Sequence, residues 1–226
     1  MTDFFREVYE ELRNDRMRSL WRNYGKFILA GIVFIVVATA AYRFYLHWSQ
    51  TRSAQSGDQF LQALEFAGNG DFSKAQTILA QLEKEGYGAY PTLARLRLAG
   101  TLLADKKPVE ALAAYDRIAG DRMVSTEMRD YAVLQAAMIG VDHESYDAVV
   151  KRTQPLLVGD NPWRYLAREA RLLSAWKAGR VEEAAKIVAE LKAAISIPQG
   201  LRQRIAIFED LIIAAGGTIP GQGGAG

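Results

Sequence analysis

The chain has 226 residues, and its 28 Lys and Arg against 26 Asp and Glu give a formal net charge of +2. It contains no cysteine, which excludes disulfides, thiolate metal ligands and a cysteine nucleophile. Its two histidines, His47 and His143, are too few for a multi-histidine metal site. From residue 49 onward, 21 basic residues balance 21 acidic ones, so this part offers no electrostatic footprint for nucleic acid.

Residues 1–26 form a charged N-terminal arm. Within it, Phe5, Val8, Tyr9 and Leu12 follow the i, i+3, i+4, i+7 spacing that predicts an amphipathic helix. Two interpretations stay open. The apolar stripe is a docking surface for a cytoplasmic partner or for the membrane surface, or the arm is a solvated helix that continues into the next segment.

The segment after the arm is apolar. Residues 27–42 carry no charge, and at 1.5 Å per residue they span about 24 Å as a helix. Extension to Trp48 gives about 33 Å, which matches the roughly 30 Å hydrocarbon core of a bilayer. Arg43 lies near the end of this span, where its long side chain can reach the interface. We therefore predict a transmembrane helix over residues 27–48.

A cleaved signal peptide is the alternative to a retained anchor, because residues 38–40 read Ala-Thr-Ala and resemble a cleavage site after Ala40. Against cleavage, 26 residues precede the apolar run, and the sequence beyond the site is still apolar and aromatic. More Lys and Arg lie close before the span than after it. This asymmetry predicts a cytoplasmic N-terminus and a C-terminal domain on the other side of the membrane.

Beyond residue 50 the sequence is a helical repeat. Alanine, leucine, glutamate and arginine dominate, and no strand-like alternation stands out. Four alanines follow polar breaks at intervals of 36, 37 and 36 residues, namely Ala75, Ala111, Ala148 and Ala184. Each alanine opens a helix, and a further helix is predicted before each break, over residues 60–67, 92–103, 129–140 and 165–178. Such helical hairpins stack because none can bury its apolar face alone.

The C-terminal part follows the repeats. Residues 199–215 come after Pro198 and predict a final helix that caps the stack. Residues 216–226 are Gly-rich and predict a flexible tail. We therefore expect an all-α protein, with a transmembrane helix followed by an α-solenoid of about four helix hairpins and a capping helix. Its expected parts are a cytoplasmic arm, an anchor, a repeat domain and a tail, over residues 1–26, 27–48, 49–215 and 216–226.

Two segments carry a resemblance to a known repeat. Residues 70–75 (GDFSKA) and 179–184 (GRVEEA) resemble the turn and the near-fixed alanine of the tetratricopeptide repeat (TPR). Tyr115 and Val188 occupy that family's later large-residue position, four residues after the alanine. The period of 36–37 residues departs from the about 34 residues of the family.

The TPR resemblance implies that the first helix of each hairpin lines a protein-binding groove. Carried onto this chain, the groove positions are Phe60, Leu64, Leu96, Leu103, Val133, Val141, Leu173 and Trp176. Each of these residues fits the hairpin core as well. The family's Lys/Asn clamp for carboxylates would fall on residues such as Leu96 and Gly100, so acidic C-terminal peptides are not expected as ligands. An apolar groove suits an amphipathic helix or an unfolded segment.

A second resemblance concerns the whole architecture. A short charged N-terminus, one anchor and a repeat domain of this size, with residues 87–99 and 163–169, resemble the YfgM family of bacterial inner-membrane proteins. This implies a single-pass protein with a periplasmic C-terminal domain. It further implies an ancillary subunit of the SecYEG translocon that works with a PpiD-like chaperone on unfolded client chains. The alternative is a TPR scaffold of another cell-envelope assembly complex.

No catalytic constellation is visible in the sequence. His143 falls in the turn between two predicted helices, where a helix cap or surface position is expected. Glu182 and Glu183 are adjacent on a helix and do not share a face. No set of nucleophile, base and orienting group is found. We therefore expect no enzymatic activity, cofactor, metal, nucleic acid or small-molecule substrate, and we expect contact with membrane lipid through the anchor.

Overall fold

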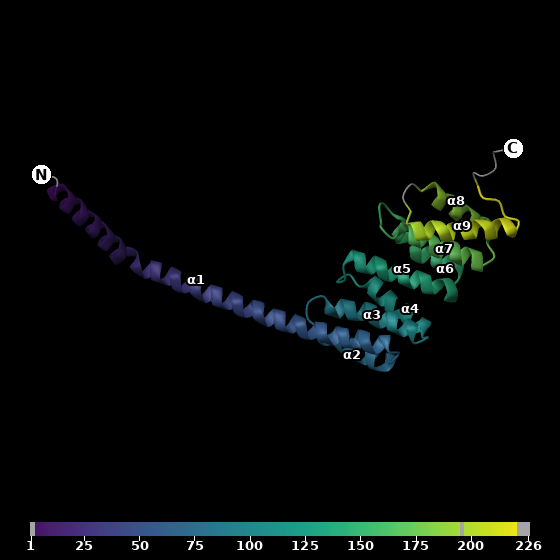
Figure 1. The fold of residues 1–226 in the computed structure, drawn as a ribbon, viewed down its shortest axis with the longest axis horizontal. Coiled ribbons are helices and arrows are strands. Elements are labelled where there is room, and N and C mark those ends of the chain that lie inside the picture. The colour runs from purple at the N-terminus through teal and green to yellow at the C-terminus, as the bar shows by residue number, and fades with distance from the viewer. Residues whose placement is uncertain (1–2, 195–196, 221–226) are drawn as a thin grey trace. The chain divides into compact units, whose positions relative to one another are not determined.

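The computed structural model describes residues 3–194 and 197–220, with side chains from Tyr24 onward. Over these residues the secondary structure is helical (Figure 1). The helices are α1 (Asp3–Gly68), α2 (Phe72–Glu85), α3 (Tyr90–Ala104), α4 (Pro108–Gly120), α5 (Thr126–His143), α6 (Tyr146–Thr153), the 3-10 helix η1 (Gln154–Leu157), α7 (Arg164–Lys177), α8 (Val181–Ala193) and α9 (Gln199–Ala214). The chain divides into two compact units, Met1–Gln55 and Ser56–Gly226.

The first unit consists of the N-terminal part of α1. Large apolar side chains along this part are exposed, with Phe27, Phe34 and Phe44 each between 73% and 74% accessible. Within the described residues, Tyr24–Gly68 is the one helical segment that is long and apolar enough to cross a membrane, judged by length and composition. The predicted span of residues 27–48 falls within it. The side chains of Phe5, Val8, Tyr9 and Leu12 lie outside the described part of the chain.

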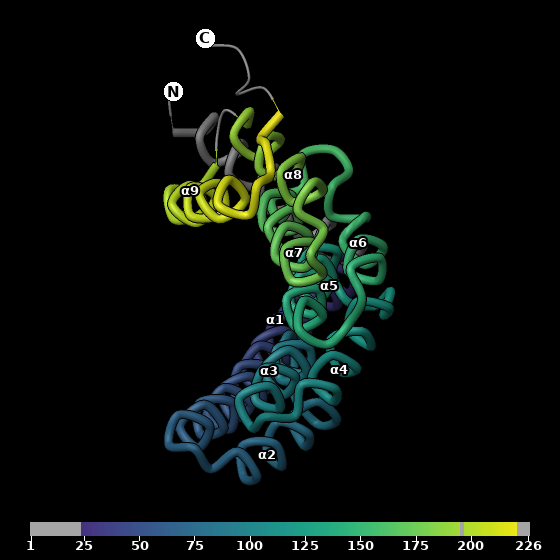
Figure 2. Tube along the Cα trace, turned by 90° about the vertical axis from the view of Figure 1, so that its right-hand side faces the viewer, coloured from purple at the N-terminus to yellow at the C-terminus, as the bar shows by residue number. Residues whose placement is uncertain are grey.

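The second unit is a stack of helical hairpins in chain order (Figure 2). The end of α1 packs on α2 through Ala63, Leu79 and Leu82, all fully buried. The following hairpins are α3/α4, α5/α6 and α7/α8, and α9 packs on α8. This array is the all-α repeat predicted from the sequence.

The repeated alanines explain how closely these helices pack. Ala75, Ala111 and Ala184 are completely buried, so their small side chains let the helix backbones approach. The third hairpin differs, because Ala148 is partly exposed and Val149 is buried in its place. Its second helix, α6, has only eight residues and is followed directly by η1.

The turns within the hairpins have local causes. Gly70 and Gly179 adopt φ values of +81° and +69°, the left-handed conformation that glycine reaches without steric cost. The backbone N–H of Lys74 donates to the carboxylate of Asp71, and that of Ala148 donates to the hydroxyl of Ser145. These contacts satisfy N–H groups left unpaired at the starts of α2 and α6.

The C-terminal end differs from expectation. Residues 216–226 were expected as a flexible tail, yet Ile219 is only 6% exposed and joins the apolar cluster that includes Leu191 and Ile212. Gly216, with φ of +81°, turns the chain after α9. Ile219 is the one large apolar side chain of the segment, and its burial extends the packed unit beyond residue 215. Residues 221–226 lie outside the described chain.

Candidate protein-binding groove

A cavity of about 470 Å³ lies among α5, α7 and α9. We call it the inner groove; it is lined by Leu134, Gln135, Met138, Leu166, Glu169, Leu173 and Arg204. Helical spacing explains how the apolar members meet. Leu134 and Met138 are one turn apart on α5, and Leu166 and Leu173 are two turns apart on α7.

The inner groove has a buried apolar floor and a solvent-exposed rim. Leu134 is 3% exposed and packs with Leu156 and Ala167, whereas Met138 is 38% exposed. On α9, Ile207 and Leu211 are 58% and 40% exposed and follow Arg204 by three and seven residues. That spacing sets them on the same side of α9 as Arg204. The rim therefore continues along α9 as exposed apolar surface.

An ion pair between a buried carboxylate and a half-exposed guanidinium lines the inner groove. Glu169 on α7 is 4% exposed, and Arg204 on α9 donates to its carboxylate through Nε and Nη2, the latter at 2.9 Å. A buried carboxylate is costly unless it is paired in this way. The hydrogen bonds with Glu169 raise the pKa of Arg204. The two charges cancel, so the lining of the inner groove carries no net charge, and most of its other side chains are apolar.

The structure places the eight predicted groove positions in several different environments. Leu173 lines the inner groove, and Leu103 is 40% exposed on α3. The aromatic members contact other rings, with centroid distances of 6.0 Å from Phe60 to Tyr90 and 6.2 Å from Trp176 to Phe208. The remaining four are partly buried, namely Leu64, Leu96, Val133 and Val141. These positions therefore do not gather in one cavity, and their role as ligand contacts stays a prediction.

Apart from Leu173, sequence reasoning missed the residues that line the inner groove, including Met138, Glu169 and Arg204. Glu169 follows Leu166 by three residues and precedes Leu173 by four, so helical spacing sets this acidic residue on the apolar side of α7, and that was the signal available for it. Its partner Arg204 lies 35 residues further along the chain. That pairing depends on how α9 packs, which the repeat pattern does not specify.

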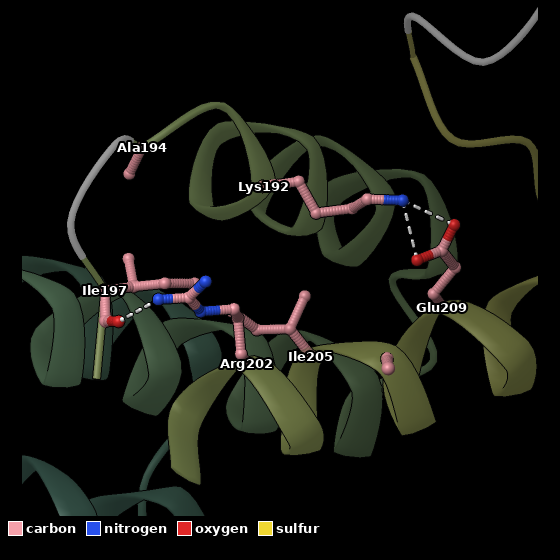
Figure 3. Close-up of a pocket in the computed structure, with 7 residues that line it drawn as sticks. Lys192, Ala194, Ile197, Arg202, Ile205 and Glu209 are labelled. Carbon is pink, nitrogen blue, oxygen red and sulfur yellow. Dashed lines mark hydrogen bonds and ion pairs between the residues drawn. The ribbon is translucent and has the colours of Figure 1, made fainter. Parts of the chain in front are cut away.

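A second hollow of about 240 Å³ lies between α8 and α9 (Figure 3). Ile197 and Ile205 are buried beside it, and Lys192 and Glu209 form an ion pair across it at 2.7 Å. In the part of the chain that the structure describes, no group of three His, Asp or Glu residues is placed to hold a metal ion.

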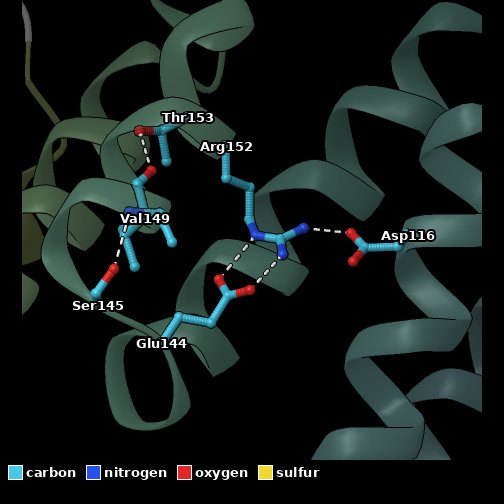
Figure 4. Close-up of polar contacts among 7 residues, drawn as sticks. Asp116, Glu144, Ser145, Val149, Arg152 and Thr153 are labelled. Carbon is cyan, nitrogen blue, oxygen red and sulfur yellow. Dashed lines mark hydrogen bonds and ion pairs between the residues drawn. The ribbon is translucent and has the colours of Figure 1, made fainter.

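An ion-pair network joins the second and third hairpins (Figure 4). Arg152 on α6 donates to Glu144 at 3.1 Å through Nε and at 2.7 Å through Nη2, and its Nη1 donates to Asp116 on α4. The side chains of Arg152 and Glu144 are 16% and 21% exposed. The network holds neighbouring repeats together and lies away from the cavities.

The stacked hairpins define a helical-repeat protein. A family described as "Tetratricopeptide repeat-like domain" matches residues 18–171, and the chain belongs to this family. The match begins ahead of the apolar stretch and ends within α7, so α8 and α9 lie beyond it. No curated protein and no solved structure matched the chain. Repeat domains of this kind typically serve as scaffolds for other proteins rather than as catalysts.

Proposed function

We propose that this protein is a membrane-anchored scaffold that binds other proteins. The observation that carries the proposal is the combination of a TPR-like array with an exposed apolar helix in one chain. Exposed apolar side chains such as Phe27 and Phe34 lose their contact with water when the helix lies in a bilayer. The inner groove supplies an apolar surface for a partner segment.

The finer proposal follows from the resemblance to the YfgM family. In it, the protein resides in a bacterial inner membrane with a cytoplasmic N-terminus and a periplasmic repeat domain. It acts as an ancillary subunit of the SecYEG translocon and links that complex to a PpiD-like chaperone. Anchoring works through proximity, because it raises the effective concentration of the repeat domain near chains that emerge from the translocon.

The test is purification of the tagged full-length protein in a mild detergent, followed by mass spectrometry of the proteins that accompany it. We expect translocon subunits and a periplasmic chaperone in stoichiometric amounts. A control variant carries an unrelated anchor in place of residues 1–48. Loss of the translocon from the control sample locates the contact in the arm or anchor.

Two results would change the proposal. Recovery of a different envelope complex would replace the translocon link with the alternative, a TPR scaffold of that complex. Purification without any stoichiometric partner, under conditions that keep the translocon itself intact, would remove the scaffold proposal altogether.

A further inference from the structure

Helix α9 is the last helix that the structure describes, and no described helix follows it to complete a hairpin. The repeat architecture pairs α3 with α4, α5 with α6 and α7 with α8, and each second helix also packs near the following hairpin. Helix α9 takes the position of the first helix of a fifth hairpin, because it follows α8 and packs on it. No described segment supplies the second helix of that hairpin. The surface where such a helix would pack is the side of α9 next to α8.

An open hollow lies at this position. We call it the outer crevice; it is lined by Lys192, Ala194, Ile197, Arg202, Ile205, Ala206 and Glu209 (Figure 3). Its floor is apolar, since Ile197 and Ile205 are 7% and 3% exposed. A shallow depression that shares Arg202 and Ala206 continues the crevice along the N-terminal half of α9.

The tail of the chain covers the other half of this surface. A Cβ placed on Gly217 would lie 2.7 Å from Val181 and 2.8 Å from Ile212, which shows how closely the tail runs against α8 and α9. The tail leaves the crevice itself open, since none of Thr218, Ile219 and Pro220 lines it.

The charges of the outer crevice indicate what kind of ligand would bind there. Lys192 is neutralised by Glu209, with both carboxylate oxygens at 2.7 Å from Nζ. Arg202 donates to the carbonyl oxygen of Ile197 at 3.1 Å and forms no ion pair within the described residues. The crevice thus offers one uncompensated guanidinium beside an apolar floor. A helix with an apolar face and a flanking carboxylate complements both features.

We propose that the outer crevice binds an amphipathic helix of a partner protein, with carboxylates beside its apolar face, as the second helix of a fifth hairpin. This site goes beyond the scaffold function of the inner groove. The partner helix would need about the length of α8, which has 13 residues. The apolar face packs on Ile197, Ile205 and Ala206, and a carboxylate pairs with Arg202.

The test uses the full-length chain in detergent and a fluorescein-labelled synthetic helix. This probe has the length of α8, leucines along one face and glutamates beside them. Binding is followed by fluorescence anisotropy. The variant Ala206→Trp fills the crevice, and we expect it to weaken binding by about tenfold or more. The control Ala104→Trp adds the same side chain at an exposed position at the end of α3 that lines neither the outer crevice nor the inner groove, and we expect a change of less than about twofold.

The charge is tested separately. Arg202→Gln is expected to weaken binding of the glutamate probe, but not of a probe with glutamines in their place, and added salt should reduce the difference. The proposal is overturned if the wild-type chain does not bind the probe, or if Ala206→Trp weakens binding no more than Ala104→Trp does. It is overturned as well if Leu211→Trp, at the rim of the inner groove, weakens binding and Ala206→Trp does not, because the probe then lies in the inner groove. It is also overturned if light scattering shows a dimer that Ala206→Trp dissociates, because the occupant is then a second copy of the chain.

Discussion

The contact between the second and third hairpins allows a quantitative prediction. Replacing Arg152 with alanine removes two hydrogen bonds to Glu144 and one to Asp116. Breaking a fully buried ion pair costs about 3–5 kcal/mol, because one charge remains buried without a partner. Here the Asp116 side chain is 42% exposed, so water replaces part of what is lost. We therefore expect the free energy of unfolding of the repeat unit to fall by about 2–3 kcal/mol.

The loss is measured by urea unfolding of the full chain, followed by circular dichroism. For a unit of this size, it corresponds to a decrease in Tm of about 5–10 °C. Lys151→Ala removes an exposed charge from the same helix and should change stability by no more than about 0.5 kcal/mol. Adding Glu144→Gln to Arg152→Ala should recover part of the loss, since the unpaired carboxylate is then gone. Equal stability of Arg152→Ala and the Lys151 control would refute the reasoning.

Three further predictions concern α3, α4, α5 and the inner groove. Gly140→Ala should destabilise the unit, because a Cβ there would lie 2.5 Å from a carboxylate oxygen of Glu144 that Arg152 holds in place. Gly100→Ala, whose Cβ would lie 3.4 Å from the hydroxyl oxygen of Tyr115, should raise the free energy of unfolding by up to about 1 kcal/mol. Equal urea midpoints for the two variants would contradict this contrast. Burial raises the pKa of Tyr115 to about 12, so the folded state favours the neutral phenol. The contribution of Tyr115 to the free energy of unfolding should therefore be fully present below about pH 10 and be lost as the pH rises toward 12. Tyr115→Phe should abolish that part of the alkaline decline in urea titrations, and an unchanged pH profile would count against it. Leu173→Asp should weaken binding of an apolar client peptide by about tenfold in anisotropy measurements without unfolding the unit, and unaltered binding would remove the inner groove from the account.

The repeat could be predicted because its causes are local. The alanines at 75, 111 and 184 recur at a fixed spacing, and the glycines at 70 and 179 occupy turns that need a positive φ. Such signals are visible in a short window of sequence. The second hairpin shows their limit, because Lys106 adopts φ of +59° where a glycine would be expected.

The groove could not be predicted in the same way. The family pattern assigns groove positions by their place in each helix, yet Trp176 is covered by Phe208 of α9. The pairing of Glu169 with Arg204 depends on contacts across 35 residues of chain. The burial of Ile219 likewise depends on the space left between α8 and α9. These features arise where the repeat ends, and a repeating pattern carries no information about its own end.

The central claim is that one chain combines an anchor that is retained in the membrane with a protein-binding repeat unit. Its most direct test is the intact mass of the protein recovered from membranes washed at alkaline pH, which removes peripheral proteins. We expect the chain to stay in the membrane fraction with residues 1–40 retained and a mass of 25.1 kDa for the 226 residues. A chain released into the soluble fraction, with a mass that lacks the residues up to Ala40, would contradict it.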